Sequence, residues 1–225
     1  MIPLAAPSPG GLAGDRPVEL LVLLALMAVA PLVLVTLTSF LKIAVVLSVA
    51  RSALGAPQVP PTTAVTGLAL LLSLSVMAPV AEEAWRAARA GPPARGAEQV
   101  IAAAARATGP LKGFLARFAR PEDRRLFLDL SRRLRPDRRE EVGDGDLAVL
   151  APAFMVSELR RAFAVGFLVF LPFLAVDLAV ANVLLALGLT QLSPTAVSLP
   201  FKLLLFVAVD GWALLARGLV AGYLP

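Results

Sequence analysis

The chain has 225 residues, of which 58% are hydrophobic and only 16% are charged, whereas globular proteins carry about 25% charged residues. It contains no cysteine and no histidine, which excludes disulfides, thiolate nucleophiles, Cys/His zinc sites, histidine-ligated haem and Ser-His-Asp triads. Residues 82–146 hold 25 of the 37 charged side chains, and we attribute the net charge of +5 to loops beside a membrane, not to nucleic-acid binding. This composition predicts an all-α integral membrane protein with a charged insert.

The first half of the apolar body contains two stretches long enough to cross a bilayer, which takes about 20 residues. One covers Leu20–Ala50 and is interrupted by Pro31 and Lys42, and the other covers Thr62–Ala81. The short proline-rich turn between them predicts an antiparallel hairpin. Because Met1–Gly14 carries no charge and the apolar run exceeds the 7–15 residues of a secretory signal, we expect a retained membrane element.

The second half contains two further apolar stretches. The third covers Leu147–Leu189, and we expect the polar patch 157–161 and Pro172 to split it. The fourth covers Ala196–Leu219 and follows another short turn, so a second hairpin is predicted. The expected divisions are an N-terminal tail (1–19), a first apolar hairpin (20–81), a charged helical insert (82–146) and a second apolar hairpin with its loop (147–225).

The charged insert shows two helical patterns. The weaker one, around residues 100–105, is expected to end at Gly109-Pro110, and the stronger one begins at Pro121 with acids in its first turn. We interpret the insert as a solvated cap of mixed charge, in preference to a patch for anionic lipid or RNA. The count of Lys and Arg would place it in the cytoplasm, but loops longer than about 60 residues cross membranes largely regardless of charge.

Outside the polar patch 157–161, ionisable residues deep inside the apolar stretches include Lys42, Asp177, Lys202 and Asp210. Such groups are costly in a membrane and indicate a partner or a polar pathway. No acid lies within a helical turn of Lys42, so its partner must come from elsewhere. We favour pairing groups within an assembly over the alternative, an ion-coupled secondary carrier that uses Lys42, Asp177 and Asp210. An enzyme would need a dyad such as Ser39 with Lys42, which we favour least.

Several ordered motifs resemble one known family. They are Thr38–Ile43 (TSFLKI), Leu150–Leu159 (LAPAFMVSEL), residues 170–173 (FLPF), Leu199–Phe206 (LPFKLLLF) and residues 209–212 (VDGW). Together they resemble the export-gate protein of type III secretion, called SctR (also YscR or HrcR) in injectisomes and FliP in flagella. The resemblance covers nearly the whole chain from about residue 20.

This resemblance implies a non-enzymatic, pore-forming subunit with no cofactor and no metal, embedded in the bacterial inner membrane. It implies about five copies that assemble with SctS-like and SctT-like subunits, and with SctU-like and SctV-like export proteins as further partners. Unfolded secreted proteins would pass through the centre. The complex would project to the periplasmic side, which puts the insert outside the cytoplasm, against the charge count.

The resemblance also implies roles for particular residues. Glu158 of the Ser-Glu-Leu motif and Lys202 of the Pro-Phe-Lys motif would lie at contacts between neighbouring copies. Leu189-Thr190-Gln191 would form the pore constriction, where the family often has consecutive methionines, so a three-residue methionine ring is excluded. The N-terminus favours an injectisome over a flagellum, and this Leu-Thr-Gln sequence resembles the plant-associated injectisome branch of the family. The alternatives are a flagellar export-gate subunit, the secondary carrier and a structural scaffold.

Overall fold

The computed structural model describes residues 17–56, 58–91 and 97–224, and the secondary structure of these ranges is helical without a strand. The predicted all-α fold is therefore confirmed. The N-terminal residues 1–16, which include most of the predicted tail, lie outside the described residues. The helices in chain order are α1 (Pro17–Thr36), α2 (Phe40–Ala53), α3 (Thr62–Arg89), α4 (Ala97–Phe118), α5 (Pro121–Leu134), the 3₁₀ turn η1 (Pro136–Arg138), α6 (Leu147–Ala186), α7 (Pro194–Ala208) and α8 (Gly211–Ala221).

The first apolar stretch is divided into α1 and α2 by a break at residues 37–39. Pro31 lies inside α1 and does not end it. The break coincides with local side-chain bonds: Thr38 Oγ1 donates to the carbonyl of Leu34 and accepts from the amide of Phe40. Threonine hydroxyls that bond the backbone in this way compete with the helical hydrogen bonds. The boundary within this stretch is therefore marked by a hydroxyl and not by the proline.

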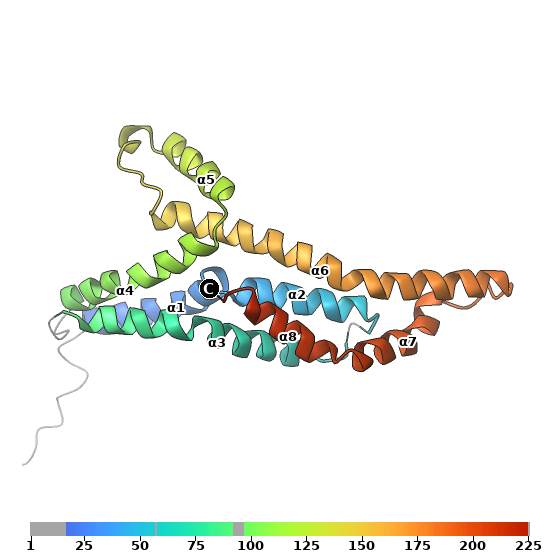
Figure 1. The fold of residues 1–225 in the computed structure, drawn as a ribbon. Helices are drawn as coiled ribbons and strands as arrows, with labels where there is room; N and C mark the ends of the chain where they lie inside the picture. Colours follow the sequence, from blue (N-terminus) through green and yellow to red (C-terminus); the bar gives the residue numbers. More distant parts are fainter. Residues whose placement is uncertain (1–16, 57, 92–96, 225) are drawn as a thin grey trace, which may run out of the picture.

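Helix α2 lies at the centre of the molecule, between α3 on one side and α6 on the other (Figure 1). It forms the predicted hairpin with α3, and its most extensive packing is with α6. At the crossing, a Cβ on Gly166 would lie 3.1 Å from Val49 Cγ1, so the glycine permits the close approach of the two helices. The apolar core of this half contains Ile43, Val46, Leu47, Ala50, Val65, Ala69, Ala162, Phe173 and Phe206.

The expected split of the third stretch is wrong, because α6 is one helix of 40 residues that continues through the polar patch 157–161 and Pro172. At 1.5 Å per residue it is about 60 Å long, and it runs along most of the molecule (Figure 1). The patch does not interrupt the helix because its polar side chains bond to other elements: Ser157 to the start of α5, and Glu158 to α2. A proline in a membrane helix is tolerated when surrounding groups satisfy the freed carbonyl.

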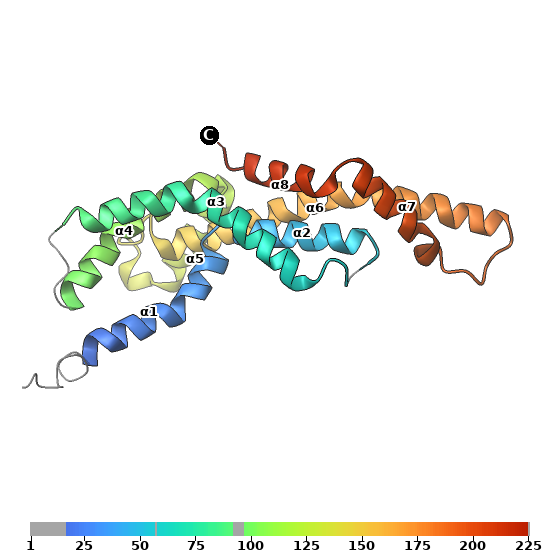
Figure 2. The same ribbon diagram turned by 90° about the horizontal axis from the view of Figure 1, so that it is seen from below.

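The fourth stretch is the one that breaks, into α7 and α8, which are bent by 58° relative to each other. The bend lies at Val209 and Asp210, and Asp210 adopts the left-handed conformation with φ 49°. Gly211 follows in direct contact with the Phe206 ring, which leaves no room for a Cβ. The α7–α8 arm packs beside α3 and α6, and α8 runs back along the outside of the molecule toward the middle of its length (Figures 1 and 2).

The charged insert begins within a helix, because α3 continues past residue 82 to Arg89. Helix α4 does not end at Gly109-Pro110 as expected but continues to Phe118, packed against α3 and α6. Helix α5 begins at Pro121 as predicted and packs against α6. The insert is thus built onto the apolar body through α4 and α5, which branch from one end of it (Figure 1).

Two helices, α3 and α6, are long and apolar enough to span a membrane, and the bent pairs α1–α2 and α7–α8 could raise the number to four. Only 17% of the most apolar window of α3 and 11% of that of α6 are buried within this single chain. Most of their apolar surface is therefore available to lipid or to other subunits.

Candidate functional site

A buried charge cluster surrounds Glu158, whose side chain has no exposed surface. Its Oε2 lies 3.6 Å from Lys42 Nζ and also accepts a hydrogen bond from the hydroxyl of Tyr223. Its Oε1 accepts from Nη1 of Arg161 at 2.7 Å. Lys42 Nζ lies 3.6 Å from the centroid of the Tyr223 ring, in a cation–π contact. We call these four residues the Glu158 cluster.

The Glu158 cluster joins α2, α4, α6 and the segment after α8. The Tyr223 ring packs against Phe118 and Phe114 of α4, with centroid distances of 4.9 and 6.1 Å. Arg161 Nη1 also donates to the carbonyl of Phe118 at 2.7 Å, next to the end of α4. Burial, followed by the charge of Glu158, raises the pKa of the Tyr223 phenol, so its hydroxyl stays protonated and can donate.

A second buried group, the Lys202 cluster, consists of Lys202, Asp177 and Ser198. Lys202 Nζ lies 2.6 Å from Asp177 Oδ2, and Ser198 donates to Asp177 Oδ1 at 2.5 Å. Lys202 Nζ also donates to the carbonyl of Ala53 at 3.1 Å, at the C-terminal end of α2, where a cation is favoured by the helix dipole. Lys202 is 3% exposed, so this contact ties α7 to α6 and α2 from inside the packed body.

The structure supplies the partners that the embedded lysines lack in their own stretches: Glu158 for Lys42, and Asp177 for Lys202. Within the single chain, Glu158 and Lys202 belong to different clusters. Their contact between neighbouring copies therefore stays a prediction. The three residues of the carrier alternative are not gathered, since Lys42 and Asp177 lie in different clusters and Asp210 lies at the α7–α8 bend.

The Ser39–Lys42 dyad is not formed among the described residues. Ser39 Oγ lies 3.0 Å from Ser73 Oγ on α3, and Lys42 faces Glu158. Among all the residues that the structure describes, no group of three or more Asp or Glu side chains is placed to hold a metal ion.

Sequence reasoning missed four residues of this site: Arg161, Tyr223, Ser157 and Asp123. Ser157 accepts from the amide of Arg120 at 2.9 Å and donates to Asp123 Oδ2 at 2.7 Å, which binds the start of α5 to α6. A run of polar residues inside a long apolar helix, such as the patch 157–161, can indicate a contact point as well as a break. The position of the single tyrosine carries no comparable signal.

The predicted constriction, Leu189-Thr190-Gln191, forms part of the loop between α6 and α7 at one end of the molecule (Figure 1). Gly188, with φ 72°, follows the end of α6, and the amide of Leu189 donates to the carbonyl of Leu184 at 2.9 Å. This arrangement is typical of a helix that closes with a left-handed glycine. All three residues are exposed in the single chain, and their role in a pore stays a prediction.

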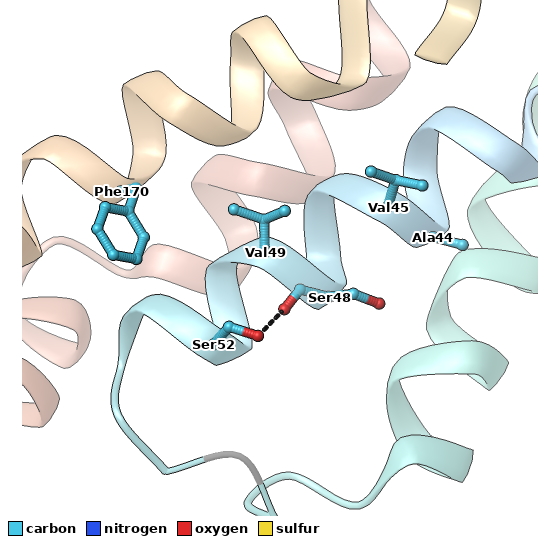
Figure 3. Close-up of a pocket in the computed structure, with 6 residues that line it drawn as sticks. All are labelled: Ala44, Val45, Ser48, Val49, Ser52 and Phe170. Carbon is cyan, nitrogen blue, oxygen red and sulfur yellow. Dashed lines mark hydrogen bonds between the residues drawn. The ribbon is translucent and has the colours of Figure 1, made fainter.

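An apolar hollow of about 340 Å³ lies on the outer face of α2 beside Phe170 of α6 (Figure 3). Its lining is Ala44, Val45, Ser48, Val49, Ser52 and Phe170. The Ser52 hydroxyl donates to the carbonyl of Ser48 at 2.9 Å, so this hydroxyl serves its own helix. The hollow offers apolar packing surface and few groups that could orient a small polar molecule.

Comparison with known proteins finds relatives over nearly the whole chain. The model of the FliP family matches residues 23–219. The chain is 43% identical to Yop proteins translocation protein R of Yersinia pestis over 208 residues, which cover 92% of the chain and 96% of that relative. It is 42% identical to hypersensitivity response secretion protein HrcR of Ralstonia nicotianae, covering 91% and 96%. It is also 42% identical to flagellar biosynthetic protein FliP of Caulobacter vibrioides, covering 93% of the chain and 77% of that relative.

Proposed function

Because the chain belongs to the FliP family, we propose that it is a pore-forming subunit of a type III protein-export gate in the bacterial inner membrane. The observation that carries this proposal is a family match over nearly the whole chain, together with relatives that are named for protein translocation and secretion. We propose a non-enzymatic role: the subunit forms part of a path for unfolded proteins.

We assign the chain to an injectisome. The injectisome relatives are 43% and 42% identical over 96% of their own lengths, whereas the flagellar relatives from Caulobacter and Bacillus subtilis are 42% and 39% identical over 77% and 91% of theirs. The identities are close, so a flagellar export gate is the second candidate.

The fold is compatible with assembly. Helices α3 and α6 leave most of their apolar surface exposed, which suits packing against further subunits. We propose about five copies of this chain with SctS-like and SctT-like subunits, and contacts to SctU-like and SctV-like proteins. In this arrangement Leu189, Thr190 and Gln191 line the constriction, Glu158 and Lys202 lie near contacts between copies, and the insert faces the periplasm.

A secretion assay tests the proposal. Deletion of the gene should abolish export of a reporter substrate, the full-length chain should restore it, and a tagged chain should be recovered from the membrane with the two small partner subunits. Unimpaired export without the gene would contradict the proposal. The purified chain reconstituted alone should show no ion-coupled uptake, and such uptake would favour the carrier.

A further inference from the structure

The Glu158 cluster has more positive than negative charge. Lys42 and Arg161 both face the one carboxylate of Glu158, and the remaining partners, the Tyr223 hydroxyl and the Phe118 carbonyl, are neutral. Arg161 is the accessible cation, because its side chain is 36% exposed whereas that of Lys42 is 7% exposed. Both hydrogen bonds described for Arg161 use Nη1, and a guanidinium has further N–H groups to donate.

The side of α6 that carries Arg161 also carries exposed apolar residues. Val165 and Leu168, four and seven residues after Arg161, are exposed on the same side of the helix, and the neighbouring Arg160 is paired with Asp123. Glu158 is shared between Arg161 and Lys42, so the two cations together lack one negative charge, and a partly exposed cation in a helix suited to a membrane is unfavourable unless a further acid or water covers it. The face therefore fits a partner surface that is apolar and carries one carboxylate.

Asp210 carries the negative charge that would complement Arg161. It is exposed, lies between the exposed residues Val209 and Leu214, and has no ion pair or side-chain hydrogen bond within the described ranges. A residue in its position before α8 would ordinarily cap the helix, but the Asp210 side chain makes no capping bond. Its left-handed backbone suits Asp and Asn alike, so the turn does not require the charge.

We propose that Asp210 of one copy of this chain docks on the Arg161 face of a second copy. The two surfaces lie on different elements, with Arg161 on α6 and Asp210 at the α7–α8 bend. Contact between two different surfaces is head-to-tail, and repetition of such a contact gives a ring or a helical assembly. The inference rests on the proposed multi-copy export gate and names the contact that joins its copies.

Cysteine cross-linking tests this contact, since the chain has no cysteine of its own. Ala164 follows Arg161 by three residues on α6, Ala213 follows Asp210 by three residues on α8, and both alanines are exposed. Ala164 shares the helix face of Arg161, and Ala213 lies in the first turn of α8 directly after the bend at Asp210, so A164C and A213C in one chain should form a ladder of disulfide-linked multimers in oxidised membranes. Each single-cysteine chain is the control and should give no ladder.

Asp210→Asn in the two-cysteine chain isolates the role of charge, because asparagine keeps the size and the left-handed preference. The ladder should fall about tenfold or more, in line with the coupling of close charge pairs across interfaces. An unchanged ladder after D210N, or no ladder from the two-cysteine chain, would overturn the contact. If amine cross-linking of the wild-type chain also gives only monomers, the multi-copy gate fails as well, whereas multimers there would leave the gate standing.

Discussion

Lys42 Nζ of α2 lies 3.6 Å from Glu158 Oε2 of α6, and both side chains are almost completely buried. This ion pair connects the two apolar hairpins at one end of α2, while the Lys202 cluster connects them at the other end through the Ala53 carbonyl. Each end of α2 is thus bound by a charged residue from another apolar stretch: Glu158 at the start of α2 and Lys202 at its end.

Loss of the Glu158 charge should be strongly destabilising. Glu158→Gln leaves Lys42 and Arg161 buried without their carboxylate, which costs about 3–5 kcal/mol. Thermal unfolding of the purified chain in detergent would measure the loss. Asp129→Asn is the matched control, because it breaks the exposed Arg133–Asp129 pair, worth about 0.3–0.5 kcal/mol. Equal effects of the two changes would contradict the importance of the buried cluster.

Exchange of the Asp177 and Lys202 charges should restore the assembly that reversal of either charge alone blocks. Lys202→Asp alone brings two carboxylates together and should block assembly, and addition of Asp177→Lys should restore part of it, since the two groups lie 2.6 Å apart. Assembly would be measured by recovery of the partner subunits with the tagged chain.

The corresponding exchange of Glu158 and Lys202 tests the proposed contact between copies. Either reversal alone should block export, because it brings like charges together beside Lys42 and Arg161 or beside Asp177. Within one chain the double exchange leaves both clusters with like charges, so partial recovery of export by the double exchange would require the two residues to meet across neighbouring copies. Normal secretion by a Glu158→Lys chain would show that the residue has no such role.

Tyr223 should act through both its hydroxyl and its ring. Tyr223→Phe removes the hydrogen bond to the Glu158 carboxylate and should cost about 1.5–3 kcal/mol. Tyr223→Ala also removes the ring from Phe114, Phe118 and Lys42 and should cost more, about 3–5 kcal/mol. Unfolding midpoints of the two variants would give the order, and a milder alanine variant would contradict the packing role.

Two glycines of α8 should respond in opposite ways to alanine. Gly211→Ala would drive a Cβ into the Phe206 ring at the α7–α8 bend, and overpacking of this kind costs about 1–3 kcal/mol. A Cβ added at Gly218 would meet nothing within 4 Å, so Gly218→Ala should be neutral or stabilise the helix by about 0.5–1 kcal/mol. A stable Gly211→Ala chain would show that the bend is not packed as described.

The order of apolar stretches and turns in this fold could be predicted because it depends on local composition and on the spacing of apolar residues. The apolar stretches, their short turns and the start of α5 at Pro121 all follow from local rules, and the structure contains them. The resemblance to the SctR/FliP family, found from the ordered motifs, is confirmed by the family match. The breaks could not be predicted in the same way, because the effect of a proline or a hydroxyl in a helix depends on the groups packed around it.

The site was only partly predictable for a similar reason. An unpaired lysine in an apolar stretch implies a partner, but nothing in the sequence selects Glu158 for Lys42 or Asp177 for Lys202, since these choices depend on how α2 and α6 cross. Arg161 and Tyr223 gain their significance only from the folded arrangement around Glu158.

The central claim is that the α6–α7 loop lines an export pore, and site-specific photo-cross-linking tests it most directly. A cross-linking amino acid at Leu189 or Gln191, in cells that export a substrate stalled by a stably folded domain, should give adducts to that substrate. The same amino acid at the exposed Leu130 of α5 should give none. Absence of substrate adducts at both loop positions, in chains that still assemble with their partners and support export, would contradict the account.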